Sequence, residues 1–263
     1  MQVNVNNQGV FAYTGGKAFD AALPSLVFVH GAGSYHGVWQ LQSRYFAHHG
    51  YNVLAVDLPG HAMSSGAPLK SIEAMGEWII ALLDALTIKQ AALVGHSMGS
   101  LASLQAAGAH PQRVSKLALL GTAFPMPVSE QLLSAAKAND HSAMDMLNVW
   151  GLSPAAQINA NPMPGMWMSG ASMRVLERNA PDVIYTDLSA CNAYQAGLER
   201  AARVACPTLV ISGNADVMTP PRSAQNLVDA IPGAKKMLIA GSGHSLMNEK
   251  PDQVLDVLID FLP

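Results

Sequence analysis

The stretch AALVGHSMG, residues 91–99, decides the fold. It opens with a short apolar run, residues 91–94, which is typical of a strand buried on both faces of a parallel sheet. The pattern Gly-x-Ser-x-Gly follows, and small residues continue to position 108 as a closely packed helix would require. Glycine two positions before and after Ser97 predicts a sharp turn, because a side chain there would clash with neighbouring backbone. The sequence therefore predicts a strand, a strained turn that presents a serine hydroxyl, and a helix.

Other apolar runs repeat this strand signal along the chain. They are residues 26–29, 53–56, 117–120, 208–211 and 236–239, and two alternating runs at 3–5 and 10–13 predict an opening hairpin. Residues 72–86 carry apolar side chains at helical spacing, and Ser71 is placed to cap the start of that helix. The alternation of strands and helices predicts an α/β fold with a doubly wound, mostly parallel sheet. Its ligand site is expected at the carboxyl ends of the strands.

The alternation stops between residues 122 and 205. Helical patterns in this segment flank a loop at 161–168 that is rich in Pro, Met, Trp and Gly. We interpret residues 1–121 and 206–263 as the core and residues 122–205 as a helical cap. The cap holds adaptable apolar side chains that suit an acyl or aromatic pocket, and Trp150 and Trp167 are its candidate pocket residues.

Three residues form a candidate catalytic set. A serine hydroxyl such as that of Ser97 needs a neighbouring base, which in turn needs a carboxylate to orient it. Asp216 follows the predicted strand 208–211, and His244 follows the predicted strand 236–239. The order Ser, Asp, His is the one that this type of fold uses. Asp57 also follows a strand and is the alternative carboxylate, although its Leu-Pro-Gly context favours a role in the loop.

These motifs together resemble the α/β-hydrolase superfamily, in the branch that contains carboxylesterases, lactonases, carbon–carbon bond hydrolases and cofactor-free haloperoxidases. The matching segments are His30-Gly-Ala-Gly33 with Trp39, Asp57-Leu-Pro-Gly-His61, Gly95-His-Ser-Met-Gly99, Cys206-Pro-Thr-Leu-Val with residues 213–220, and Gly243-His244 with Glu249 and Pro251. The resemblance implies an oxyanion hole made by the backbone N–H groups of Ala32 and Met98. Two positions depart from the family pattern, since Ala62 and Ser100 stand where glycine is common.

The remaining histidines carry no recognisable metal-binding pattern. His30 is expected to hold the oxyanion loop, and His96 is expected to line the pocket; both are candidate pocket residues, and a structural role is equally open for each. No histidine belongs to a HExxH motif or a similar ligand set. We therefore expect neither a metal nor a cofactor.

Composition narrows the possible partners. Half of the residues are hydrophobic, 13% are charged, and the net charge of −3 comes without a basic run. Such a chain is not expected to bind nucleic acid or an anionic membrane. Residues 1–16 are polar and no long apolar segment follows, so neither a leader nor a membrane span is expected. Cys191 and Cys206 are interpreted as reduced structural cysteines of a cytoplasmic protein.

The leading hypothesis is a serine hydrolase that cleaves a small carboxylic ester, lactone or thioester through an acyl-enzyme on Ser97. Two alternatives stay open. The first is a carbon–carbon bond hydrolase of ring-cleavage products, although the relatives that do this chemistry carry Asn and Trp where His96 and Ser245 stand here. The second is a small-ligand receptor or regulatory protein with slow turnover, because a fold by itself does not fix function.

Overall fold

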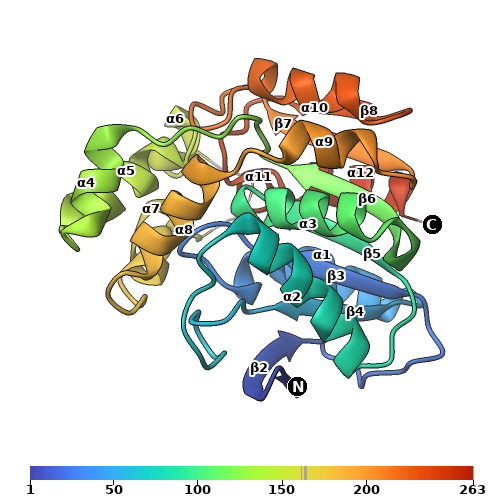
Figure 1. Cartoon of the computed structure of the whole chain (residues 1–263). Helices are drawn as coiled ribbons and strands as arrows, with labels where there is room; N and C mark the ends of the chain where they lie inside the picture. Colours follow the sequence, from blue (N-terminus) through green and yellow to red (C-terminus); the bar gives the residue numbers. More distant parts are fainter. Residues whose placement is uncertain (161, 163–164, 263) are drawn as a thin grey trace.

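A single eight-stranded sheet forms the centre of the computed structural model, which describes residues 1–160, 162 and 165–262 (Figure 1). The strand order is β1-β2-β4-β3-β5-β6-β7-β8. The strands are β1 (Gln2–Val5), β2 (Gln8–Tyr13), β3 (Ser25–Val29), β4 (Asn52–Val56), β5 (Ala91–His96), β6 (Val114–Leu120), β7 (Thr208–Gly213) and β8 (Lys235–Ile239). β1 and β2 pair antiparallel, β2 pairs antiparallel with β4, and every later pairing is parallel. This confirms the predicted α/β fold and its mostly parallel sheet.

The outer strands differ from the buried ones. The turn between β1 and β2 uses Asn6 and Asn7, both with positive φ, as the predicted hairpin requires. β8 was expected to be buried on both faces, and that expectation is wrong for most of its length. Its first four residues, from Lys235 to Leu238, are exposed because β8 is the last strand and pairs only with β7. Two lysines on this edge disfavour pairing with another chain.

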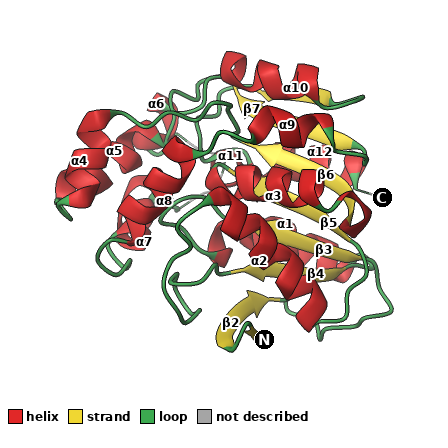
Figure 2. Ribbon diagram, viewed as in Figure 1, coloured by secondary structure: helices red, strands yellow, loops and turns green. Residues whose placement is uncertain are grey.

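Two layers of helices enclose the sheet (Figure 2). Helices α2 (Ile72–Ala85), α3 (Met98–Ala109), α9 (Gly197–Ala202) and α10 (Gln225–Ala230) pack together on one face, and α1 (Gln40–His48) packs with α12 (Pro251–Phe261) on the other. Successive strand residues alternate between the two layers, so that Val27 and Leu93 pack under α2 and α3 while Phe28 and Val94 pack under α1 and α12. As predicted, the side chain of Ser71 caps α2 by accepting a hydrogen bond from the N–H of Ala74.

The cap follows β6 and lies to the left of the sheet in Figure 1. It contains α4 (Glu130–Lys137), α5 (His141–Trp150), α6 (Pro154–Gln157), α7 (Met168–Leu176) and α8 (Val183–Ala193), most of which share a hydrophobic cluster of their own. The helix α9 falls within the segment 122–205 that we assigned to the cap, but it packs on α3 and α10 in the core layer. The backbone of Arg200 lies so close to Gly108 of α3 that a Cβ there would meet it at 2.4 Å. The cap therefore ends before α9.

No helix in the described part of the chain is long and apolar enough to cross a membrane. The two cysteines are free, with Cys191 buried and Cys206 partly buried.

Candidate active site

Ser97 lies in the sharp turn between β5 and α3. Its φ of 52° and ψ of −118° are a strained conformation for a residue with a side chain. The two glycines of the motif make that turn possible. A Cβ on Gly95 would meet the carbonyl oxygen of Gly99 at 2.2 Å, and a Cβ on Gly99 would meet the carbonyl oxygens of Val29 and His30 at 2.4 Å. The motif thus brings the start of α3 against the end of β3, as the sequence predicts, and leaves Ser97 at the carboxyl edge of the sheet.

Asp216 and His244 meet across the ends of β7 and β8. The His244 Nδ1 lies 2.8 Å from Oδ2 of Asp216, and both side chains are buried. The other carboxylate oxygen, Oδ1, accepts hydrogen bonds from the N–H groups of Met218 at 2.9 Å and Thr219 at 2.8 Å. These bonds fix the plane of the carboxylate, so that Oδ2 faces the imidazole.

The environment of Asp216 keeps its carboxyl group ionised. Burial alone would raise its pKa, but the charge and hydrogen bond of His244 and the hydrogen bonds from Thr219 outweigh burial and hold the pKa well below its ordinary value. An ionised carboxylate accepts the Nδ1–H proton of His244. That tautomer leaves Nε2 of His244 free to take a proton.

The loop predicted to form part of an oxyanion hole lies beside Ser97. A Cβ on Gly31 would meet Cβ of Ser97 at 3.1 Å, which places Ala32, the next residue, close to the serine. The N–H of Ala32 binds no acceptor in the described part of the chain. Met98 is the first residue of α3, and N–H groups in the first turn of a helix have no partner within it. Both N–H groups are therefore available to an oxygen atom held near Ser97.

His30 is absent from the residues that line the cavity, so its assignment as a pocket residue is not supported by the structure. Its ring is fully buried: Nδ1 lies 2.8 Å from the carbonyl oxygen of Gly31, and Nε2 accepts the N–H of Leu58 at 3.1 Å. Burial and the nearby His61 lower its pKa to about 4, so the ring is neutral. His30 ties the loop after β3 to the loop after β4.

Asp57, the alternative carboxylate, has other partners. It accepts hydrogen bonds from the backbone and the ring of His36, and from the N–H of Met63. It organises the loop after β4, and the carboxylate that contacts His244 is Asp216.

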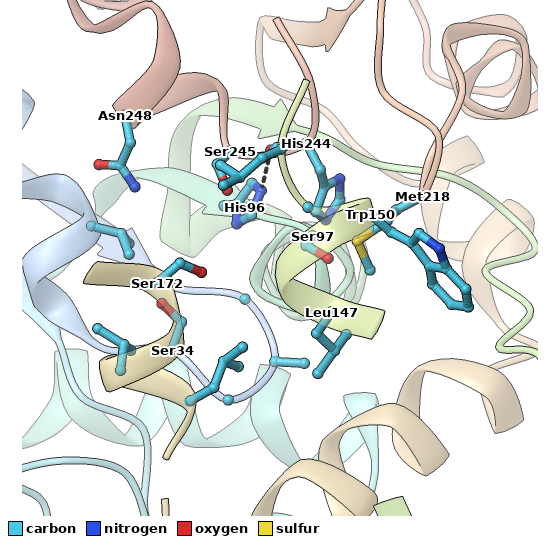
Figure 3. Close-up of a pocket in the computed structure, with 18 of the residues that line it drawn as sticks. Ser34, His96, Ser97, Leu147, Trp150, Ser172, Met218, His244, Ser245 and Asn248 are labelled. Atoms are coloured by element: carbon cyan, nitrogen blue, oxygen red, sulfur yellow. Dashed lines mark hydrogen bonds between the residues drawn. The ribbon is translucent and has the colours of Figure 1, made fainter. Parts of the chain in front are cut away.

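His96 lines the cavity and also supports the loop of His244. Its Nε2 donates a hydrogen bond to the carbonyl oxygen of His244 at 2.9 Å (Figure 3). Burial, and next the charge of His244, lowers its pKa to about 3, which keeps the ring neutral. The neutral ring of His96 donates its Nε2 proton to this carbonyl oxygen. His96 therefore supports the loop of His244 and forms part of the cavity wall.

Ser97 and His244 face a cavity of about 510 Å³ between the core and the cap. Trp150 lines it, as predicted, but Trp167 does not. The Trp167 side chain is 65% exposed and packs over Gly170 at the start of α7 instead. Met163, in the loop at 161–168 that we assigned to the cap, lies outside the described residues. Figure 3 shows Leu147, Trp150 and Met218 on one side of Ser97, and Ser34, Ser172 and Asn248 on the other.

The cavity wall has an apolar side and a polar side. Its apolar side continues the hydrophobic cluster of the cap through residues such as Leu132, Leu147 and Leu188. Its polar side consists of hydroxyl and amide groups. Among the described residues that line the cavity, none is Asp, Glu, Lys or Arg. A wall of this kind suits an uncharged molecule with a hydrocarbon portion.

Sequence reasoning missed two residues at this site. Thr219 donates its hydroxyl to Asp216, and its place three residues after the aspartate is a spacing at which polar side chains often close a turn. Asp187 of the cap binds the N–H of Gly33 in the loop after β3, and nothing in its local sequence indicates this contact across 154 residues.

No cluster of three or more His, Cys, Asp or Glu side chains in the described ranges has the geometry of a metal site.

Comparison with known proteins defines the class. The family profile described as alpha/beta hydrolase fold matches residues 24–251, so the chain belongs to this family of hydrolases. A protein of Haemophilus influenzae, provisionally named as an esterase/lipase, is 26% identical over 91% of this chain and 83% of its own length. The (E)-2-((N-methylformamido)methylene)succinate hydrolase of Acinetobacter baylyi is 26% identical over 87% of this chain and 86% of its own. Among solved structures, the enol-lactonase of Burkholderia xenovorans LB400 has a TM-score of 0.88 at 22% identity and covers 100% of this chain and 99% of that one.

Proposed function

We propose that this protein hydrolyses a small, uncharged carboxylic ester through an acyl-enzyme on Ser97. The observation that carries the proposal is the 2.8 Å contact between His244 Nδ1 and Asp216 Oδ2 at the carboxyl edge of the sheet where Ser97 stands. This arrangement supplies the base and the orienting carboxylate that a serine nucleophile needs. The name of the Haemophilus influenzae relative agrees with it.

The reaction proceeds in two halves. In the first, the Ser97 Oγ attacks the ester carbonyl carbon while His244 Nε2 takes the hydroxyl proton, and the carbonyl oxygen becomes an anion bound by the N–H groups of Ala32 and Met98. The bond to the alcohol oxygen then breaks, and His244 returns its proton to that oxygen. In the second half, His244 takes a proton from water, the hydroxide attacks the acyl carbon, and Ser97 leaves with the proton. The products are a carboxylic acid and an alcohol.

The neutral wall of the cavity supports the substrate class. Leu132, Leu147 and Leu188 offer an apolar compartment to the hydrocarbon part of a substrate. Ser34, Ser172 and Asn248 offer hydrogen bonds to an uncharged polar part. An anionic group would lose its hydration there without gaining a cationic partner.

The experiment compares wild type with Ser97→Ala on p-nitrophenyl esters of graded acyl length, and follows a fluorophosphonate label to the residue that it modifies. Label on Ser97 with turnover lost by at least about 10³-fold in the variant supports the proposal. Labelling of Ser97 with scarcely any turnover of esters would favour a specialised carbon–carbon hydrolase or a slow receptor. Absence of label, together with a fully active Ser97→Ala, would overturn the proposal.

A further inference from the structure

Two cap side chains form hydrogen bonds to Gly33 in the loop after β3. Gly33, next to Ala32, donates its N–H to Oδ2 of Asp187 on α8 at 2.8 Å, and its carbonyl oxygen accepts the side-chain amide of Asn179 at 2.8 Å. Both backbone polar groups of Gly33 are therefore bound by cap side chains. The backbone φ of 61° at Gly33 bends the loop sharply. Ala32 and Gly33 share a planar peptide group, so the backbone of Ala32 is tied to the position at which Gly33 is held.

Asp187 is itself fixed from the core. Its Oδ2 lies 2.8 Å from Nε2 of His61, in the loop after β4, and both side chains are buried. The Nδ1 of His61 lies 3.1 Å from the carbonyl oxygen of Pro59, so both ring nitrogens face acceptors. Burial alone would lower the pKa of His61, but the charge and hydrogen bond of Asp187 and the bond to Pro59 raise it. Both nitrogens of the buried His61 ring therefore face an oxygen acceptor, one from the core and one from the cap.

By itself, the buried contact between His61 and Asp187 does not favour folding. The second carboxylate oxygen, Oδ1 of Asp187, is buried and has no hydrogen-bond partner among the described residues. A buried polar contact that leaves a carboxylate oxygen unsatisfied is weak support for stability, because the desolvation of that oxygen offsets much of the attraction. Apolar packing would serve better if the only requirement were to attach the cap.

On the other side of the site, a second buried carboxylate also binds a backbone N–H group of a loop. Glu249 of α11 (Leu246–Glu249) binds with Oε2 the N–H of Gly243, beside His244, and the N–H of Ser153 in the cap. Its Oε1 is also buried and without a partner in the described part of the chain. The loop of Ala32 is thus bound to a carboxylate of the cap, and the loop of His244 shares the carboxylate of Glu249 with Ser153 of the cap.

We propose that Asp187 and Asn179 are positioning residues, through which the cap sets the Ala32 N–H at the distance that stabilises the oxyanion. The inference rests on the proposed function, because it requires that the N–H of Ala32 binds the oxyanion of the proposed reaction. Neither residue lines the cavity, so their loss affects the geometry of the transition state more than the binding of substrate.

The test measures kcat and KM separately for Asp187→Ala, Asp187→Asn and Asn179→Ala on the best p-nitrophenyl ester. Complete removal of one oxyanion donor costs about 10²–10³-fold in kcat, so a displaced donor is expected to cost at least about tenfold in Asp187→Ala. KM is expected to stay within about threefold. Asp187→Asn keeps one oxygen acceptor and is expected to recover part of the loss, and Asn179→Ala is expected to fall between the two.

The matched control is Ala136→Gly, which loosens the cap in the buried face of α4 without touching Gly33. It is expected to lower Tm while kcat stays near wild type. Equal losses of kcat in Ala136→Gly and Asp187→Ala at equal Tm would overturn the proposal, and so would an Asp187→Ala kcat within about twofold of wild type.

Hydrogen exchange separates this inference from the proposed function. The amide of Gly33 is expected to exchange faster in Asp187→Ala and in Asp187→Asn, with exchange in β5 unchanged, whether or not esters are turned over. Unchanged exchange at Gly33 in both variants would overturn the positioning role. Failure of wild type to label or turn over esters would count against the proposed function alone. If Asp187→Ala does not fold, Asp187→Asn gives both readouts and Asn179→Ala gives the kinetic one.

Discussion

The hydroxyl of Thr219 donates a hydrogen bond to Oδ2 of Asp216 at 2.7 Å, the same oxygen that faces His244. Thr219 Oγ1 also lies 3.1 Å from Nδ1 of His244. One carboxylate oxygen therefore serves two donors, and Thr219 keeps it charged and in place.

Thr219→Val removes the hydroxyl and keeps the shape of the side chain. We expect unfolding free energy to fall by about 1–2 kcal/mol and kcat to fall by about fivefold, because the carboxylate loses a charge-assisted bond. Chemical denaturation and steady-state kinetics measure both. Thr122→Val is the control: Thr122 is buried and its Oγ1 has no hydrogen-bond partner among the described residues, so this change is expected to be neutral or stabilising. Equal losses in the two variants would contradict the role of Thr219.

Asp216→Asn is expected to change how stability depends on pH. The folded protein holds the pKa of Asp216 below its ordinary value of 3.8, so the ionised carboxylate stabilises the fold above that pH. This contribution is lost progressively as pH falls from about 4 downwards, and the variant lacks it throughout. Stability of wild type should therefore decline more steeply than that of Asp216→Asn between about pH 5 and 2. Parallel curves would contradict this, and kcat of the variant at pH 7 should be at least about 10³-fold lower.

Leu147→Lys tests the neutral wall of the cavity. Wild type is expected to prefer p-nitrophenyl hexanoate over the p-nitrophenyl monoester of adipic acid by at least about 100-fold in kcat/KM, because the second ester buries a carboxylate without a partner. A lysine at Leu147 should reduce this preference by about tenfold or more. Val149→Lys, on the exposed side of the same helix, should leave it unchanged. A wild type that hydrolyses both esters equally well would exclude the assignment of an uncharged substrate.

Gly99→Ala is expected to abolish both folding and activity. The added Cβ would lie 2.4 Å from the backbone oxygens of Val29, the last residue of β3, and of His30, so the end of this central strand would have to shift. Gly233→Ala is the matched control, because this glycine has positive φ and open space around it. It should cost only about 1 kcal/mol of unfolding free energy. Circular dichroism during thermal unfolding measures both, and a well-folded, active Gly99→Ala would contradict the account of the turn.

Ala62→Gly is expected to stabilise the protein slightly. Ala62 is exposed and has φ of 42°, a conformation that costs a residue with a Cβ about 1–2 kcal/mol, and glycine relieves this at a smaller entropic cost. We expect a gain of up to about 1 kcal/mol in unfolding free energy. Ala67→Gly, in the same exposed loop but outside the residues with positive φ, should lose stability instead. A loss of stability in both variants would contradict the strain at Ala62.

Much of the core could be predicted because its signals are local. Each buried strand shows as a short apolar run, since both faces of a parallel strand are covered, and the glycines around Ser97 mark a turn that sterics forbid to other residues. The exposure of β8 could not be predicted in this way. An edge position depends on which strand comes last in the sheet, and the run of residues 236–239 does not encode that order. The helix α9 was assigned to the cap for the same reason: its sequence is helical, but only packing shows that it lies on α3.

What the sequence determined by itself is the α/β fold, the serine turn, and the placement of Asp216 and His244 after their strands. These follow from local periodicity and from the rule that parallel strands end at one edge of a sheet. Only the tertiary structure decided that His30 holds a loop instead of lining the cavity, that Trp167 points to solvent, and that Asp187 reaches Gly33. Such contacts join residues far apart in the chain, and their geometry is set by how the cap packs on the core, which no local pattern records.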